Sequence, residues 1–99
     1  MADIYQALAH PIRREILGIL RVKPRSAGEL ATSFSIAKPT LSGHLNILKE
    51  CQLIDVERRG TTLIYSINLS VAEEALSGLM SLFRVGHEAP VTTDKKLSE

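Results

Sequence analysis

The sequence is poor in cysteine and in aromatic residues, and both shortages limit what the chain can be. Its 99 residues include one cysteine, no tryptophan, two tyrosines and two phenylalanines. A single cysteine excludes an internal disulfide and any metal site built from several cysteines of one chain. The short length predicts one small domain, which can gain further burial by pairing with a second copy.

Long hydrophobic runs are missing as well. No apolar stretch approaches the roughly 20 residues that cross a membrane, and the opening M-A-D-I-Y-Q lacks the basic and apolar regions of a signal peptide. We therefore expect a cytoplasmic protein without membrane contact. No carboxylate pair or glycine-rich loop has a spacing suited to catalysis, so we expect no enzyme activity.

The charge is nearly balanced overall but uneven along the chain. Residues 1–68 hold nine Lys or Arg against six Asp or Glu, whereas residues 69–99 hold three against five. A basic first part would face an anionic partner such as nucleic acid, and the acidic last part would face elsewhere. The difference is small, so individual segments must decide the function.

The most informative segment runs from residue 35 to residue 52. Leu41, Leu45 and Leu48 recur at helical spacing and predict one buried stripe. The first turn and the opposite side carry small or polar groups, which are Lys38, Pro39, Thr40, Ser42, Gly43 and Asn46. An ordinary surface helix usually shows long charged side chains instead. Short polar groups near a helix N-terminus can bind base edges or phosphates, so both interpretations stay open at this point.

The preceding residues predict three shorter helices. Asp3 is a candidate N-cap for a helix over residues 3–9, and Pro11 begins a second one over residues 11–22. Ser26 and Glu29 have the spacing of a capping box, which opens a helix that extends to about Phe34. Two short helices joined by a tight connection, the second of which shows small polar groups, are typical of a helix-turn-helix.

Residues 53–68 predict a β-hairpin with a basic tip, which is the wing of a winged-helix domain. Ile54 and Val56 alternate with acidic residues, and Gly60 lies between the two strands. A charged tip is often only a solvated turn. After this helix pair, we favour a role for Arg58, Arg59 and Thr61 in holding the DNA backbone, with Arg13, Arg14 and Arg25 as secondary candidates.

A last helix is predicted after the hairpin. Ser70 and Glu73 form a second possible capping box, and apolar residues recur at helical spacing to about Val85. We expect residues 1–88 to form one winged helix-turn-helix domain and residues 89–99 to form a flexible tail.

These motifs, taken in order, resemble the ArsR family of bacterial winged-helix repressors. The resemblance rests on Ala7–Leu17, Glu29–Ala31, Lys38–Lys49, and Arg58-Arg59-Gly60 leading to Tyr65-Ser66-Ile67. It implies a mainly α fold with a small β-hairpin, a winged helix-turn-helix of the α+β class. It also places the recognition positions at Lys38, Pro39, Thr40, Ser42, Gly43 and His44. Gly43 departs from the histidine often found there.

The resemblance further implies a homodimer joined through the first and last helices. The interface positions are then Ile4, Tyr5, Leu8, Ala72, Ala75, Leu76, Leu79, Met80 and Phe83. The alternative is a last helix that folds back on its own domain. The leading hypothesis is a dimeric repressor that binds an inverted repeat in double-stranded DNA, with the promoter of its own gene as a candidate operator.

Metal sensing is common in the family, but its ligand sets are missing from this sequence. Residues 29–34 hold no cysteine, and the opening Leu69-Ser70-Val71 of the last helix holds no Asp or His. Only His87 and Glu88 lie near its end, so the sequence resembles the metal-independent branch, and we expect no metal or cofactor. Alternatives are control by another ligand, control by oxidation at Cys51, or a winged-helix module that binds protein.

Overall fold

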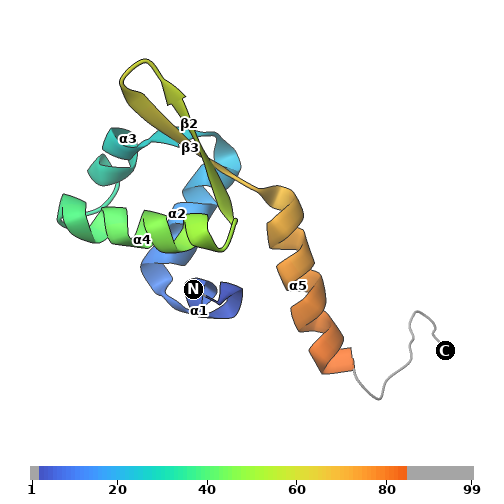
Figure 1. Ribbon diagram of the computed structural model, residues 1–99. Helices are drawn as coiled ribbons and strands as arrows, with labels where there is room; N and C mark the ends of the chain where they lie inside the picture. Colours follow the sequence, from blue (N-terminus) through green and yellow to red (C-terminus); the bar gives the residue numbers. More distant parts are fainter. Residues whose placement is uncertain (1–2, 85–99) are drawn as a thin grey trace.

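The computed structural model describes residues 3–84, and the predicted tail at residues 89–99 lies outside the described part, as do His87 and Glu88. The domain boundary therefore stays a prediction. The described elements, in chain order, are α1 (Ile4–Ala9), α2 (Pro11–Val22), β1 (Arg25–Ser26), α3 (Ala27–Thr32), α4 (Lys38–Glu50), β2 (Ile54–Arg59), β3 (Thr62–Ile67) and α5 (Leu69–Arg84). Figure 1 shows the first four helices and the hairpin in one body, with α5 standing beside it.

The core lies between α2, α3, α4 and the base of the hairpin. The predicted leucine stripe of α4 is confirmed, since Leu41, Leu45 and Leu48 are at most 3% exposed. The other members of this cluster are Ala7, Ile16, Leu17, Leu20, Leu30, Leu53 and Ile54. The helices α2, α3 and α4 therefore each bury one apolar face, as their periodicity predicts.

Side chains cap two of the helices where the sequence predicts. Asp3 accepts a hydrogen bond from the Tyr5 amide, and Ser26 and Glu29 form a complete capping box. The predicted box at Ser70 is wrong, because α5 already begins at Leu69. Asn68 takes the capping role, since its side-chain oxygen accepts from the Val71 amide at 3.2 Å. Asparagine is as good an N-cap as serine, and here it directly follows the last strand.

The predicted hairpin is confirmed, and a third strand joins it. β1 pairs with β3 through Arg25 opposite Tyr65 and Ser26 opposite Ile64, which gives the antiparallel order β1-β3-β2. Two residues cannot show an alternating pattern, so this strand has no signal in the sequence. Gly60 has a φ of 64°, which matches the two-residue turn that joins β2 to β3.

The end of α4 contains a strained residue. Gln52 has a φ of 64°, a left-handed conformation that glycine adopts without cost. Its amide donates to the carbonyl of Lys49, and the Leu53 amide donates to the carbonyl of Leu48, both at 3.0 Å. This pair of bonds is a Schellman motif, which usually has glycine at the left-handed position.

Replacing Gln52 with glycine is therefore expected to stabilise the protein. Gln52 is exposed, so its side chain contributes little packing. Relief of the left-handed conformation should raise the free energy of unfolding by about 0.5–1 kcal/mol. Chemical denaturation of Gln52→Gly and Gln52→Ala measures this difference. If alanine stabilises the protein as much as glycine, the strain explanation is wrong.

Candidate nucleic-acid interface

The N-terminal half of α4 presents the small polar groups that the sequence singles out. Lys38, Pro39, Thr40, Ser42, Gly43 and Asn46 are exposed, whereas His44 is half-buried. Ala37 occupies the N-cap position, and no side-chain hydrogen bond caps the helix there. The first backbone amides of α4 therefore have no side-chain acceptor. The dipole of this 13-residue helix also places its positive end at the same terminus. This end of α4 suits an anionic group such as phosphate.

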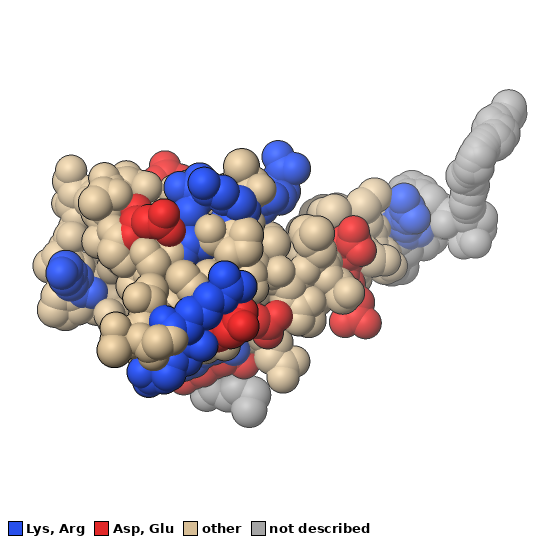
Figure 2. All heavy atoms as spheres, turned by 90° about the horizontal axis from the view of Figure 1, so that it is seen from above, with Lys and Arg blue, Asp and Glu red and all other residues tan. Residues whose placement is uncertain are grey.

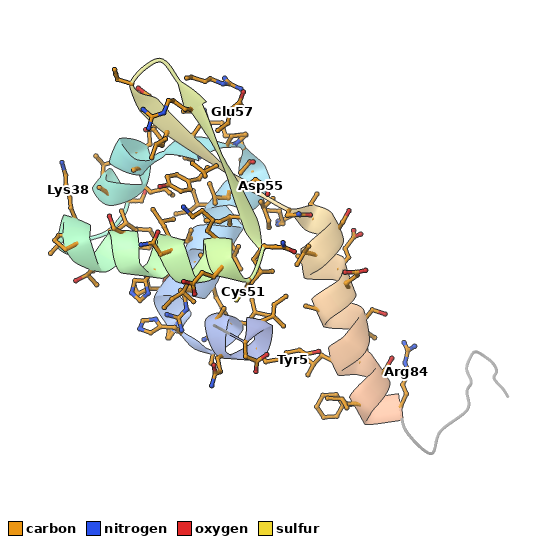
Figure 3. All side chains as sticks on the ribbon, in the orientation of Figure 1. Tyr5, Lys38, Cys51, Asp55, Glu57 and Arg84 are labelled. Atoms are coloured by element: carbon orange, nitrogen blue, oxygen red, sulfur yellow. The ribbon has the colours of Figure 1, made fainter. Side chains whose placement is uncertain are left out.

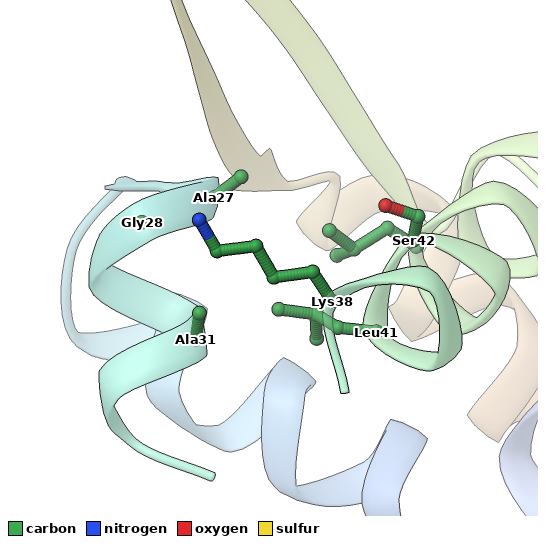
Figure 4. Close-up of a pocket in the computed structure, with 7 residues that line it drawn as sticks. Ala27, Gly28, Ala31, Lys38, Leu41 and Ser42 are labelled. Carbon is green, nitrogen blue, oxygen red and sulfur yellow. The ribbon is translucent and has the colours of Figure 1, made fainter. Parts of the chain in front are cut away.

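Two adjoining hollows connect the start of α4 to the wing. One, of about 120 Å³, lies between α3 and α4, where Ala27, Gly28 and Ala31 face Lys38 and Ser42. Figure 4 shows the Lys38 side chain reaching across it toward the beginning of α3. The second hollow shares Ala27 and Gly28 with the first and extends to Thr61 at the wing tip. Sequence reasoning missed the small residues of α3, which carry no polar group that would have marked them.

The wing tip carries both of its predicted arginines on the surface. Arg58, Arg59 and Thr61 are exposed. Arg59 Nη2 lies 3.3 Å from Glu57 Oε1, and both side chains are 67% exposed. Such an exposed pair contributes little stability, so the guanidinium can exchange its partner readily. Figure 2 shows basic and acidic side chains intermingled over the body, as the low net charge leads one to expect.

His44 belongs to a small cluster that joins α4 to the N-terminal helices. Its ring centroid lies 4.5 Å from that of His10, and Arg13 Nη1 lies 3.3 Å from His44 Nδ1. Because a guanidinium can only donate, this nitrogen accepts, and the ring is then neutral. Burial lowers the pKa of His44, and the nearby His10 and Arg13 lower it further. His44 therefore packs at the edge of the buried stripe.

Arg13 and Arg14 hold α1 in place, a role that the sequence did not reveal. Arg13 Nε donates to the carbonyl of Ala7 at 2.8 Å, and its Nη2 donates to the carbonyl of Gln6 at 3.1 Å. Arg14 Nη1 donates to the carbonyl of Leu8 at 2.8 Å. These carbonyls lie at the end of a helix that is too short to bond them itself. Both arginines, which were secondary candidates for phosphate contact, are thus engaged within the chain.

The lowered pKa of His44 predicts a stability that declines in mild acid. The folded state accepts a proton on this ring less readily than the unfolded chain, so unfolding becomes easier below the ordinary histidine pKa of about 6.5. His44→Gln keeps an acceptor for Arg13 and removes the titration. Urea denaturation between about pH 7 and about pH 5 should show a smaller loss of stability for this variant. Equal losses in both proteins would contradict the prediction.

Cys51 has the environment of a structural residue. The thiol is half-buried, and burial raises its pKa, with Glu50 and Asp3 acting in the same direction. A raised pKa lowers the thiolate fraction on which oxidation depends.

Among residues 3–84, no group of three or more His, Cys, Asp or Glu side chains is arranged to hold a metal ion. No described helix is long and apolar enough to span a membrane.

A broad apolar patch is exposed on α5 and the neighbouring part of α1. This patch, called the α5 patch below, consists of Tyr5, Leu76, Leu79, Met80, Leu82 and Phe83, which are 36–76% exposed. Other predicted interface residues are covered by their own chain. Ala75 is 7% exposed, and Ile4, Leu8 and Ala72 pack against the core. The predicted interface is thus divided between internal packing and an open face.

Comparison with known proteins identifies the family of this chain. The family model described as "Bacterial regulatory protein, arsR family" matches residues 10–56. The transcriptional repressor SdpR of Bacillus subtilis (strain 168) is 35% identical over 86 residues, which are 87% of this chain and 96% of SdpR. The chain belongs to the ArsR family. It is therefore a DNA-binding transcriptional regulator, which confirms the expectation of a regulator and not an enzyme.

Solved structures of ArsR-type proteins share the fold. An ArsR-like transcriptional regulator from Rhodococcus sp. RHA1 is 29% identical with a TM-score of 0.71, covering 84% of this chain and 73% of that one. The transcriptional repressor BigR from Xylella fastidiosa is 28% identical with a TM-score of 0.64, covering 80% and 81%. The winged helix-turn-helix predicted from the sequence is confirmed.

Proposed function

We propose that this protein is a homodimeric repressor that acts in the cytoplasm on an inverted-repeat operator without sensing a metal. Two copies of α4 would enter successive major grooves about 34 Å apart. Lys38, Thr40, Ser42 and Asn46 would read bases or position the helix. Arg58, Arg59 and Thr61 would hold the sugar-phosphate backbone. The DNA upstream of its own gene is the first operator to test.

One observation carries the DNA part of the proposal. The exposed polar start of α4 and the exposed wing tip border the same pair of adjoining hollows, so one nucleic-acid surface can contact both. Figure 3 places Lys38 at the opposite end of the molecule from Arg84 of α5. This arrangement leaves α5 available for a second subunit while α4 and the wing face DNA.

The α5 patch supports the dimer. A monomeric protein rarely exposes so many large apolar side chains on one continuous face. A two-fold axis beside α5 would bury this patch against its own copy, which is the arrangement of most homodimers. Membership of the ArsR family and the description of SdpR as a transcriptional repressor favour repression over activation.

Titration of DNA against the full chain tests the proposal. We would measure binding to the DNA upstream of its own gene and to a scrambled duplex of equal length, at several salt concentrations. The same series would be run with Zn²⁺ and with a chelator. We expect tight binding to the upstream DNA alone, a strong salt dependence, and no effect of Zn²⁺.

Three outcomes would count against parts of this proposal. Release of DNA by Zn²⁺ would show a metal site that the described residues do not reveal. Equal weak binding to both duplexes would exclude the upstream DNA as operator. Binding that does not depend on salt would contradict phosphate contacts by the wing and by α4.

A further inference from the structure

Two histidine rings lie side by side where α4 meets the junction of α1 and α2. The ring centroids of His10 and His44 are 4.5 Å apart, and the ring planes are tilted by 55°. His10 is exposed, and His44 is half-buried. The repressor model proposed above gives neither ring a task.

Hydrogen bonds determine where each ring carries its proton. The Ile12 amide donates to His10 Nδ1 at 3.1 Å, and Arg13 Nη1 donates to His44 Nδ1 at 3.3 Å. A backbone amide and a guanidinium can only donate, so both Nδ1 atoms are acceptors. Each neutral ring therefore holds its hydrogen on Nε2, and the pair presents two N–H donors of the same kind.

Both Nε2–H groups are open to another molecule. No further hydrogen bond joins either ring to residues 3–84. Among the side chains of these residues that are not exposed, Arg25 Nε is the only buried nitrogen or oxygen without a partner. His44 Nε2 is thus in contact with solvent, as is the exposed ring of His10.

The surrounding charge favours an anion over a metal ion. The guanidinium of Arg13 is bonded to His44 and to the carbonyl of Ala7, which keeps its positive charge beside the rings. That charge repels a cation and attracts an anion. No third His, Cys, Asp or Glu within residues 3–84 joins the two histidines to complete a metal site.

The histidine pair borders α4 on the side away from the wing. Lys38 and Ser42 line the adjoining hollows that lead toward the wing. His44 follows Ser42 by two residues, which places it about 160° away around the helix. Gly43 and Asn46 lie between these two borders and are exposed. A molecule laid on this face of α4 meets the wing side at one edge and the histidines at the other.

A helix in the major groove of DNA has a sugar-phosphate strand along each of its edges. The groove is about 12 Å wide, and a helix with its side chains is about 10–12 Å across. Lys38 and the wing would cover one of the two strands. We propose that His10 and His44 bind a phosphate of the other strand through their two Nε2–H groups. This inference rests on the proposed entry of α4 into the major groove, and it adds a contact outside α3, α4 and the wing.

His10→Asn tests the contact, because asparagine can keep the helix cap while the imidazole donor is removed. Its side-chain oxygen can accept from the Ile12 amide, as His10 Nδ1 does. We expect the full chain to bind both the upstream and the scrambled duplex roughly tenfold or more weakly, because each subunit loses a hydrogen bond to a charged group. The ratio of the two affinities should not change, since phosphate contacts carry no sequence information.

Gln6→Ala is the matched control for this variant. It removes an exposed, neutral amide side chain from the neighbouring helix α1 and keeps the backbone carbonyl that Arg13 contacts. Its affinity for both duplexes should equal that of the unmodified chain. Urea denaturation of both variants establishes that their stability is comparable.

Nuclear magnetic resonance of the imidazole rings provides a second measurement on the unmodified chain. In long-range ¹H–¹⁵N spectra at about pH 8, where ordinary histidines are neutral, both rings should carry the hydrogen on Nε2. Spectra of His10→Asn and His44→Gln assign the signals. Duplex DNA should shift the signals of both rings. Inorganic phosphate at the same phosphate concentration should shift them far less, because DNA is also held by other contacts.

The inference is wrong if His10→Asn binds both duplexes as tightly as Gln6→Ala does. An Nδ1–H tautomer of His10, or rings that bound DNA does not shift, would also overturn it. Equal shifts with inorganic phosphate would indicate an anion site that is separate from DNA binding. A chain that binds neither duplex would contradict the proposed function itself, whereas tight binding that His10→Asn leaves intact would contradict this contact alone.

Discussion

Leu76→Glu is expected to convert the protein into a monomer that has lost most of its affinity for a two-part operator. Leu76 lies within the α5 patch and is 57% exposed in its own subunit. In a two-fold interface the substitution occurs twice, once from each subunit. Only the exposed part of Leu76 can be buried by a partner, so each copy loses about 1–1.5 kcal/mol of apolar burial, and it also introduces a carboxylate that must be desolvated. The dimer dissociation constant should therefore rise by roughly 10³-fold or more.

The loss of DNA affinity follows from the geometry. A monomer engages one half-site at a time, so it loses the gain that comes from linking two binding events. We expect operator binding to weaken by about 10²–10⁴-fold, while the structure of α4 and the wing is unchanged. Sedimentation equilibrium measures the oligomeric state, and a DNA titration at fixed salt measures the affinity.

Ser77→Glu is the matched control for this experiment. Ser77 is the next residue of α5 and is also exposed, but it lies on the polar side of the helix with Glu73 and Glu74. The control adds the same charge to the same helix outside the α5 patch. Circular dichroism establishes that both variants are folded. A dimeric Leu76→Glu, or an equally dissociated Ser77→Glu, would exclude the α5 patch as the interface.

Local patterns predicted the elements that form the candidate DNA surface. The leucine stripe of α4, the capping box at Ser26 and the turn at Gly60 all follow from rules that act within a few residues. The predicted end of the third helix at about Phe34 is two residues too long, since α3 ends at Thr32. Helix ends depend on local hydrogen bonds that composition determines poorly.

Contacts between distant segments could not be predicted in this way. The strand β1 exists because Arg25 and Ser26 meet β3 about 40 residues later along the chain, and two residues carry no periodicity. Arg13 shows the same limit. Its partners are carbonyls of α1 and His44 of α4, which lie on other elements and leave no local pattern in the sequence. Only its positive charge was visible there, and that charge predicted a phosphate contact. Packing likewise decides which of the predicted dimer residues stay exposed, as Ala75 demonstrates.

The second large effect is expected at the wing. Replacing Arg58 and Arg59 together with alanine should reduce the slope of log K against log salt by about 3 to 4. Each phosphate contact contributes about 0.9 to this slope, and a dimer carries each arginine twice. The affinity at physiological salt should fall by roughly 10²–10³-fold. Specific and scrambled DNA should be affected alike, because phosphate contacts carry no sequence information.

Arg84→Ala is the control for lost charge, since Arg84 lies on α5 far from the wing (Figure 3). It should leave the slope unchanged. An unchanged slope in the double variant would show instead that the wing is only a solvated turn. A change in sequence preference would indicate base contacts, which the proposal does not assign to these arginines.

Glu57→Gln distinguishes a wing that contacts phosphate from one that acts through its structure. Glu57 holds Arg59 at 3.3 Å in an exposed pair, and its carboxylate would also face the DNA backbone. The pair contributes at most about 1 kcal/mol, so the fold should not suffer from its loss. Removing the carboxylate releases Arg59 for phosphate and should strengthen binding by roughly two- to fivefold. Weaker binding would mean that Glu57 positions Arg59, and that the pair persists when DNA is bound.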